Sequence, residues 1–261
     1  MSMQKSFVRI GILLLVGFFL VVGFKSQNAN IPTLLEIPAH NTHDLIICHT
    51  GYCLAYDEKF KLAKWVAYEL TLAETEGEVG RNDKFKPDPV ITHNSASLED
   101  YKKSGYDRGH LAPAADMKWS VVAMEESFYL SNMCPQDKSF NRGIWKKLEE
   151  QVREYAKHNK QIKVVTGPIL QEGLPVLGPN RISIPRYFYK ALLDYSQPSI
   201  KAIAYLIKNE HSELPLSHFA ISIDSLEKIS GIDFFPLLPD VEENKLEKEK
   251  CYSCWETDKN H

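Results

Sequence analysis

The residues with the clearest chemical potential lie at positions 106–113, which read Tyr-Asp-Arg-Gly-His-Leu-Ala-Pro. Asp107, Arg108 and His110 place an acid, a guanidinium and an imidazole within four residues, and Gly109 lies between them. The unperturbed pKa of an imidazole is close to physiological pH, so a histidine held here can accept a proton at neutral pH. The stretch therefore predicts a general base at the end of a strand.

Four other side chains could join His110 in one site: Arg81 in a polar loop, Asn132, and Asn141 with Glu149 on a predicted helix. Hydrolysis of a phosphodiester needs a base for water, together with positive charge for the phosphorane and the leaving oxygen. Magnesium keeps several waters and takes few protein oxygens, so the Asn141 carbonyl can be its single direct ligand. Glu149 can then hold metal-bound water, while Arg81 donates to phosphate oxygens.

Each of these residues also has an ordinary structural explanation. Asn141 could be the N-cap of its helix, and Asn132 could cap a turn. Glu149 could pair with Arg153 one turn further along the helix. His110 could be a hydrogen-bonded surface residue, and Arg81 an ordinary loop charge. All of these alternatives must hold together for the site to be absent.

Three motifs together resemble the DNA/RNA non-specific endonuclease family of the ββα-metal superfamily. Residues 107–110 match the family's D-R-G-H, and residues 131–136 match its S-N-x-x-P-Q. Its metal-helix pattern is matched by Asn141-Arg142-Gly143-x-Trp145-x-x-Leu148-Glu149. Arg81 with Phe-Lys-Pro-Asp-Pro at 85–89 resembles the family's upstream arginine segment, and the similarity extends from about residue 45 to residue 239.

The resemblance implies a role for each residue. His110 would be the general base, Asn141 the direct Mg²⁺ ligand, and Glu149 the binder of the metal's waters. The implied supporting residues are Arg81, Arg108, Asp107 and Asn132. Mg²⁺ is the implied cofactor, with Mn²⁺ as the alternative metal.

The implied function is metal-dependent endonucleolytic cleavage of DNA and RNA, with little regard for sugar or sequence. Two other functions stay open: a nucleic-acid-binding module without catalysis, and a metal phosphodiesterase that acts on small nucleotides. Whether the protein forms a homodimer also stays open.

Short apolar runs separated by turn residues predict an α+β domain. Strands are expected at 45–48, 52–56, 63–70, 162–166, 187–193 and 202–207, and an extended segment at 128–133 that Pro135 ends. Helices are expected at 117–128, 140–158 and 223–229, the last ended by Gly231, and a short helix or turn at 97–103. We therefore predict a central antiparallel sheet flanked by helices, with a ββα-metal finger at one edge.

The two ends differ from the remainder. Lys5 and Arg9 precede an apolar run of about 15 residues, which is short for a membrane span but suits a secretory signal. Residues 1–30 are therefore a signal peptide for export (secreted or periplasmic), or an uncleaved N-terminal membrane anchor. Residues 31–240 would form the endonuclease domain, and residues 241–261 a solvated, charged C-terminal tail.

The whole chain of 261 residues has a formal net charge of −3, so no general basic field attracts nucleic acid, and any such site must be local. A local basic cluster lies beside the predicted metal helix and could follow a phosphate backbone or be a solvated helix face: Lys138, Arg142, Lys146 and Lys147.

The cysteines form two close pairs. Cys48 and Cys53 flank a predicted hairpin turn, and Cys251 and Cys254 form a C-x-x-C in the tail. For both pairs a disulfide or free thiols are expected rather than catalysis, and Cys134 is left over.

Overall fold

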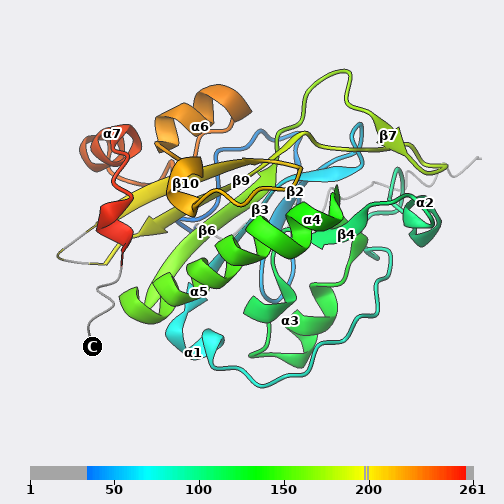
Figure 1. Cartoon of the computed structure of the whole chain (residues 1–261), viewed down its shortest axis with the longest axis horizontal. Helices are drawn as coiled ribbons and strands as arrows, with labels where there is room; N and C mark the ends of the chain where they lie inside the picture. The colour runs from blue at the N-terminus through cyan, green and yellow to red at the C-terminus, as the bar shows by residue number, and fades with distance from the viewer. Residues whose placement is uncertain (1–33, 197, 199, 257–261) are drawn as a thin grey trace, which may run out of the picture. The chain divides into compact units, whose positions relative to one another are not determined.

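The structure, a computed structural model, describes residues 34–196, 198 and 200–256. Seven antiparallel strands form its main sheet in the order β1-β2-β3-β6-β9-β10-β11 (Figure 1). The strands are β1 (Leu45–Cys48), β2 (Cys53–Asp57), β3 (Leu62–Thr71), β6 (Gln161–Pro168), β9 (Tyr187–Asp194), β10 (Lys201–Lys208) and β11 (Ala220–Ile221). The predicted central antiparallel sheet is confirmed, and only β11 in it was not expected.

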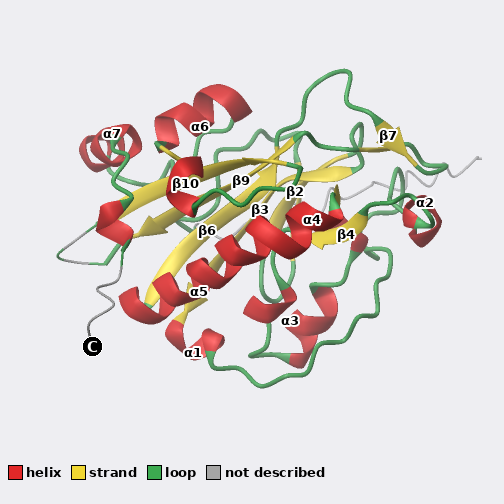
Figure 2. Cartoon of the chain, in the orientation of Figure 1, coloured by secondary structure: helices red, strands yellow, loops and turns green. Residues whose placement is uncertain are grey.

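Helices cover both faces of this sheet (Figure 2). Alternate residues of β3 point to opposite faces, so Val66 joins the cluster that contains α5 (Lys146–Asn159), while Trp65 joins the other. That second cluster contains α6 (Ile223–Ser230) and α7 (Asp240–Lys248). The sheet is thus buried on both faces, and each fully buried large apolar side chain contributes about 1.5–3 kcal/mol.

A separate two-stranded ribbon lies beside the sheet and leads into the long helix. It pairs β4 (Asp107–His110) with β5 (Met133–Gln136), and α4 (Lys138–Phe140) follows directly. This is the predicted hairpin and helix finger. The remaining elements are α1 (Leu72–Thr75), α2 (Leu98–Tyr101), α3 (Val121–Glu126), and the short strands β7 (Val176–Leu177) and β8 (Ile182–Ser183).

Two expectations around the ribbon are wrong. Leu130–Asn132 is a turn of 3₁₀ helix rather than extended chain, because the Asn132 N–H donates to the Tyr129 carbonyl at 3.0 Å. Pro135 lies inside β5 instead of ending it. A two-stranded ribbon leaves the outer side of each strand unpaired, so the missing N–H of Pro135 costs no ladder bond.

The predicted helices are confirmed with shifted ends. The helix expected at 117–128 covers only Val121–Glu126, because the Ser120 side chain accepts a hydrogen bond from Ala123 N and caps it. The helix expected at 140–158 begins at Lys138 and contains a π-helical turn, Asn141–Trp145, where Gly143 departs from helical angles (φ −108°, ψ −109°). Gly231 ends α6 in the left-handed conformation, as predicted (φ 71°).

The interpretation of the C-terminal segment as a solvated tail is wrong for part of it. Leu246 of α7 is buried, and Trp255 is 1% exposed, with its ring 5.0 Å from that of Tyr155 on α5. Both cysteine pairs form disulfides, Cys48–Cys53 and Cys251–Cys254. Cys134 is a buried free thiol.

The predicted signal peptide or anchor at residues 1–30 lies outside the described residues. Among the residues from 34 to 256 that the structure describes, no helix is both long and apolar enough to cross a membrane.

Candidate active site

A cavity of about 510 Å³ opens beside β4 and the start of the long helix. Its walls come from the loop after α1, from β4 and the chain that follows it, from the π-helical turn and from α5. The predicted site residues that line it are Arg81, Arg108, His110, Asn141 and Glu149. Asp107 and Asn132 lie outside the lining.

His110, the last residue of β4, is held between two aromatic rings. Its ring centroid lies 4.9 Å from that of Phe128 and 5.8 Å from that of Phe85, and the residue is 9% exposed. The Nε2 atom has no hydrogen-bond partner among the described residues. Burial, with the positive charge of Arg81, lowers the pKa of His110 to about 3. The imidazole is therefore neutral at pH 7, which is the protonation state that a general base requires.

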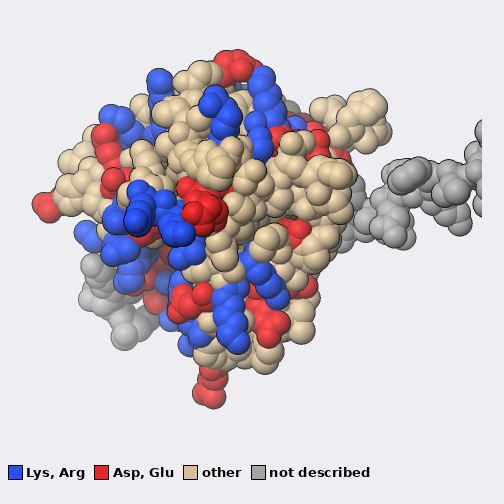
Figure 3. All heavy atoms as spheres, turned by 90° about the vertical axis from the view of Figure 1, so that its right-hand side faces the viewer, with Lys and Arg blue, Asp and Glu red and all other residues tan. Residues whose placement is uncertain are grey.

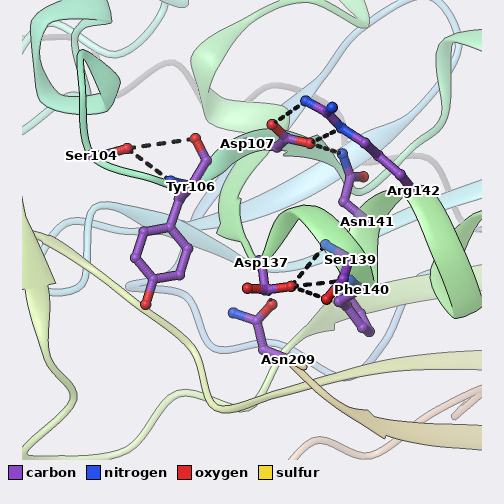
Figure 4. Close-up of polar contacts among 9 residues, drawn as sticks. All are labelled: Ser104, Tyr106, Asp107, Asp137, Ser139, Phe140, Asn141, Arg142 and Asn209. Carbon is purple, nitrogen blue, oxygen red and sulfur yellow. Dashed lines mark hydrogen bonds and ion pairs between the residues drawn. The ribbon is translucent and has the colours of Figure 1, made fainter. Parts of the chain in front are cut away.

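The Asp107 carboxylate orients the Asn141 amide (Figure 4). It accepts a hydrogen bond from Asn141 Nδ2 at 2.9 Å and two from the Arg142 guanidinium, each at 2.8 Å. Burial opposes ionisation of Asp107, but these hydrogen bonds hold its pKa below the ordinary range. Because Nδ2 is engaged, Asn141 Oδ1 is left for the cavity, and it accepts no hydrogen bond from the part of the chain that the structure describes.

Asn141 is not the N-cap of the helix, so that alternative is wrong. The cap is Asp137, whose carboxylate accepts hydrogen bonds from Ser139 N at 2.8 Å and Phe140 N at 3.2 Å. The Asn141 N–H instead donates to the Asp137 carbonyl at 2.8 Å, inside the helix. The side chain of Asn141 is consequently not used to cap the helix, and only Asp107 engages it among the described residues.

The alternative pairing of Glu149 with Arg153 is also wrong. Arg153 donates to Asp116 at 2.8 Å, and the Tyr68 hydroxyl donates to the second oxygen of the same carboxylate, also at 2.8 Å. Among the described residues, Glu149 is influenced by burial and by neighbouring charges and by no hydrogen bond. Burial raises the pKa of Glu149 above its ordinary range, and the charge of Lys190 opposes the rise.

Lys190 does not line the cavity, but its charge acts on Glu149, and sequence reasoning missed it. It is fully buried in β9, its Nζ lies 4.8 Å from the Trp145 ring centroid, and it donates to the Leu111 carbonyl at 3.4 Å. Burial lowers the pKa of Lys190, and Glu149 opposes the change. The sequence feature that could have indicated Lys190 is its position as a single cation within the otherwise apolar run from Phe188 to Leu193.

The Asn132 side chain supports the site only by binding backbone groups of neighbouring segments. It is fully buried, and its Oδ1 accepts from Ala112 N at 2.9 Å. Its Nδ2 donates to the carbonyls of Ala112 at 2.9 Å and Ser127 at 2.8 Å. Every polar atom of the amide is thus engaged in holding the chain that follows His110.

Two guanidinium groups stack on aromatic rings at the mouth of the cavity. Arg108 lies 4.1 Å from the Phe85 ring centroid, and Arg81 lies 5.1 Å from that of Phe128. Stacking holds a guanidinium plane in place while leaving its edge free to donate to phosphate oxygens. Arg81 also pairs with Asp83 at 2.7 Å in an exposed position.

The charge of the cavity lining is predominantly positive. Its basic residues are Arg81, Arg108, Arg142, Lys146 and Arg153, and its acidic residue is Glu149. Figure 3 shows basic side chains gathered on the side of the molecule that includes β4 and α4, with acidic side chains among them. Of the predicted basic cluster, Arg142 and Lys146 reach the cavity, whereas Lys138 and Lys147 do not line it. Such a lining favours an anionic ligand.

The donor set also suits a hard divalent cation. Asn141 Oδ1 and the Glu149 carboxylate are oxygen donors that face one cavity, and neither is engaged by another described side chain. Mg²⁺ prefers oxygen donors and retains most of its waters, so two protein groups suffice to hold it.

Comparison with known proteins gives a consistent result. Residues 34–241 match the family model of the DNA/RNA non-specific endonucleases. The Danio rerio protein named nuclease EXOG, mitochondrial, is 36% identical over 210 residues, covering 73% of this chain and 60% of that protein. Homo sapiens endonuclease G, mitochondrial, is 34% identical over 204 residues, covering 71% of this chain and 68% of that protein.

The similarity extends to three dimensions. A chain in the crystal structure of the EndoG/EndoGI complex has a TM-score of 0.73 and 31% sequence identity, covering 78% of this chain and 90% of that chain. This chain spans less than two thirds of the length of the nuclease EXOG relatives, 60% for Danio rerio and 57% for Homo sapiens.

Proposed function

The chain belongs to the DNA/RNA non-specific endonuclease family, and we propose that it is a metal-dependent endonuclease that hydrolyses phosphodiester bonds in DNA and RNA. One observation carries the proposal. His110, whose imidazole is neutral, and Asn141, whose Oδ1 accepts no hydrogen bond from the described residues, both line one cavity of predominantly positive charge. A base and a hard oxygen donor on the two sides of a phosphate are what hydrolysis of this bond requires.

In the proposed mechanism, the neutral His110 imidazole removes a proton from the attacking water as the water oxygen bonds to phosphorus and the bond to the leaving oxygen breaks. Arg81 and Arg108 donate to the non-bridging oxygens of the scissile phosphate and stabilise the charge that grows on them. Asn141 and Glu149 would hold Mg²⁺, or Mn²⁺ in its place, which when bound supplies positive charge to the phosphate and the leaving oxygen. Asp107 keeps the Asn141 amide turned so that its oxygen faces the cavity.

Indifference to sequence and sugar is part of the proposal. It is supported by a cavity lined mainly with guanidinium and ammonium groups, which recognise phosphate. Contacts to phosphate position a nucleic acid but carry no sequence information.

The test is plasmid nicking and RNA degradation by the purified protein, with Mg²⁺ or Mn²⁺ and with EDTA. Cleavage of both polymers that EDTA abolishes supports the proposal. Binding of DNA without any cleavage would instead indicate a silent binding module. Turnover of bis-p-nitrophenyl phosphate with intact plasmid would indicate a phosphodiesterase for small substrates.

A further inference from the structure

Asn209 lies immediately after β10, yet its side chain reaches the point where β5 turns into α4 (Figure 4). Its Oδ1 accepts a hydrogen bond from Asp137 N at 2.8 Å. Its Nδ2 donates to the carbonyl of Pro135 at 3.2 Å and to that of Pro185 at 2.9 Å. One amide therefore ties together the end of β5, the cap of α4 and the segment that leads into β9.

This set of contacts requires both functions of an amide. A carboxamide offers one acceptor and two donors on a rigid plane, whereas a carboxylate cannot donate and an aliphatic side chain does neither. The backbone N–H of Asn209 also donates to the Arg186 carbonyl at 2.9 Å, which anchors the residue to the sheet side of the contact. Asn209 is therefore held in place at its own backbone.

Two hydrogen bonds connect the Asn209 side chain with the backbone N–H of Asn141. Asn209 fixes the backbone of Asp137, and the Asp137 carbonyl accepts the Asn141 N–H at 2.8 Å. The Asn141 amide is held at its other end by Asp107 at 2.9 Å. Asp107 sets the rotation of the amide, while the direction in which α4 leaves β5 sets where that amide lies.

We propose that Asn209 is a positioning residue for the metal site, which it serves by fixing the angle between β5 and the helix that carries Asn141. The inference rests on the proposed function, because it concerns the placement of the Asn141 oxygen toward a divalent cation. Loss of such an outer contact commonly costs about 10–100-fold in metal affinity or activity. That range is the effect expected for Asn209→Ala.

The experiment uses the full chain without nucleic acid. The rise in melting temperature is measured across a titration with MnCl₂ or MgCl₂. The stabilisation grows as RT ln(1 + c/Kd), where c is the metal concentration, so a fit gives an apparent Kd, which is called the metal midpoint below. Asn209→Ala should shift this midpoint about 10–100-fold higher, and the half-saturating metal concentration in plasmid nicking should rise in parallel. Asn209→Asp keeps the acceptor for Asp137 N but sets a carboxylate oxygen against the carbonyls of Pro135 and Pro185, so its midpoint should also lie above that of the wild type.

Asn180→Ala is a matched control. Asn180 Nδ2 also donates two hydrogen bonds, to Ser97 Oγ at 3.2 Å and Asp100 Oδ2 at 2.9 Å, and so joins the β7–β8 segment to α2. Its loss should lower the melting temperature without moving the metal midpoint.

Equal metal midpoints for the wild type, Asn209→Ala and Asn180→Ala would overturn this inference alone. If Asn209→Ala does not fold, a metal midpoint in Asn209→Asp equal to that of the wild type would overturn the inference. A wild type that shows neither metal binding nor metal-dependent cleavage would overturn the proposed function, and this inference with it.

Discussion

Replacing Gly109 with alanine should destabilise the β4–β5 ribbon, because Gln136 fills the space that a side chain at position 109 would need. A Cβ on Gly109 would lie 2.0 Å from Oε1, 2.1 Å from Cδ and 2.5 Å from Cγ of Gln136. Gln136 is fully buried, so it has no solvent into which to swing aside. The glycine before the candidate base is thus explained by a neighbour on the paired strand.

The size of the effect follows from this overlap. Forcing an extra methyl group into a packed interior costs about 1–3 kcal/mol in the free energy of unfolding. In a Gln136→Ala background the overlap disappears. Alanine should then stabilise the protein by about 0.4–1 kcal/mol, because it restricts the unfolded chain more than glycine does. The two substitutions should therefore be coupled by about 1.4–4 kcal/mol, the sum of these two effects.

The assay is urea unfolding of the wild type, both single variants and the double variant. Gln136→Ala breaks no hydrogen bond within the described chain, since neither amide atom of Gln136 has a partner there. Its own cost is therefore one of packing. If Gly109→Ala is equally destabilising with and without Gln136, overlap with this side chain is not the reason for the glycine.

Four further variants test the site and the C-terminal packing. His110→Ala should lower turnover by about 10²–10⁴-fold while leaving the metal-induced rise in melting temperature intact, and retained turnover would contradict its role as base. Asp107→Ala should raise the half-saturating Mg²⁺ concentration about 10–100-fold, because the Asn141 amide is no longer oriented. Arg142→Ala removes an exposed partner of Asp107 and one positive charge of the lining but keeps the Asp107–Asn141 hydrogen bond, so it should not raise that concentration. Equal increases in the two variants would argue against orientation by Asp107. Burial and the neighbouring Glu227 raise the pKa of Glu247 to about 8. Since a carboxyl with a raised pKa stabilises the fold below its unfolded value of 4.5 and loses this contribution as pH rises toward 8, Glu247→Gln should gain stability over the wild type between pH 5 and 8. Parallel stability curves for the two proteins would show that Glu247 does not titrate in this way.

Much of the fold follows from local patterns. The alternation in residues 63–70 predicted β3, and the 3.6-residue period after residue 140 predicted the face that α5 buries. The motif at 107–110 predicted a strand that ends on His110. Each of these features is a regular backbone conformation, and the types and spacing of neighbouring residues are enough to indicate it.

Errors arose where a segment depends on distant partners. Trp255 was expected in a solvated tail, but a ring of α5 covers it. Lys190 was passed over because a lone cation in a strand has meaning only when its neighbours are known. Asn209 carried no motif at all, and its contacts join residues that the sequence keeps apart.

The sequence by itself determined which groups are available: a base, an amide oxygen, a carboxylate and several guanidinium groups, in a known order. Only the tertiary structure decided which atoms of those groups are free. Asp107 engages the Asn141 nitrogen across 34 residues, and Asn209 holds the start of the same helix across 72. An amide has two different ends, and which end faces the cavity depends on the hydrogen bond that the other end makes.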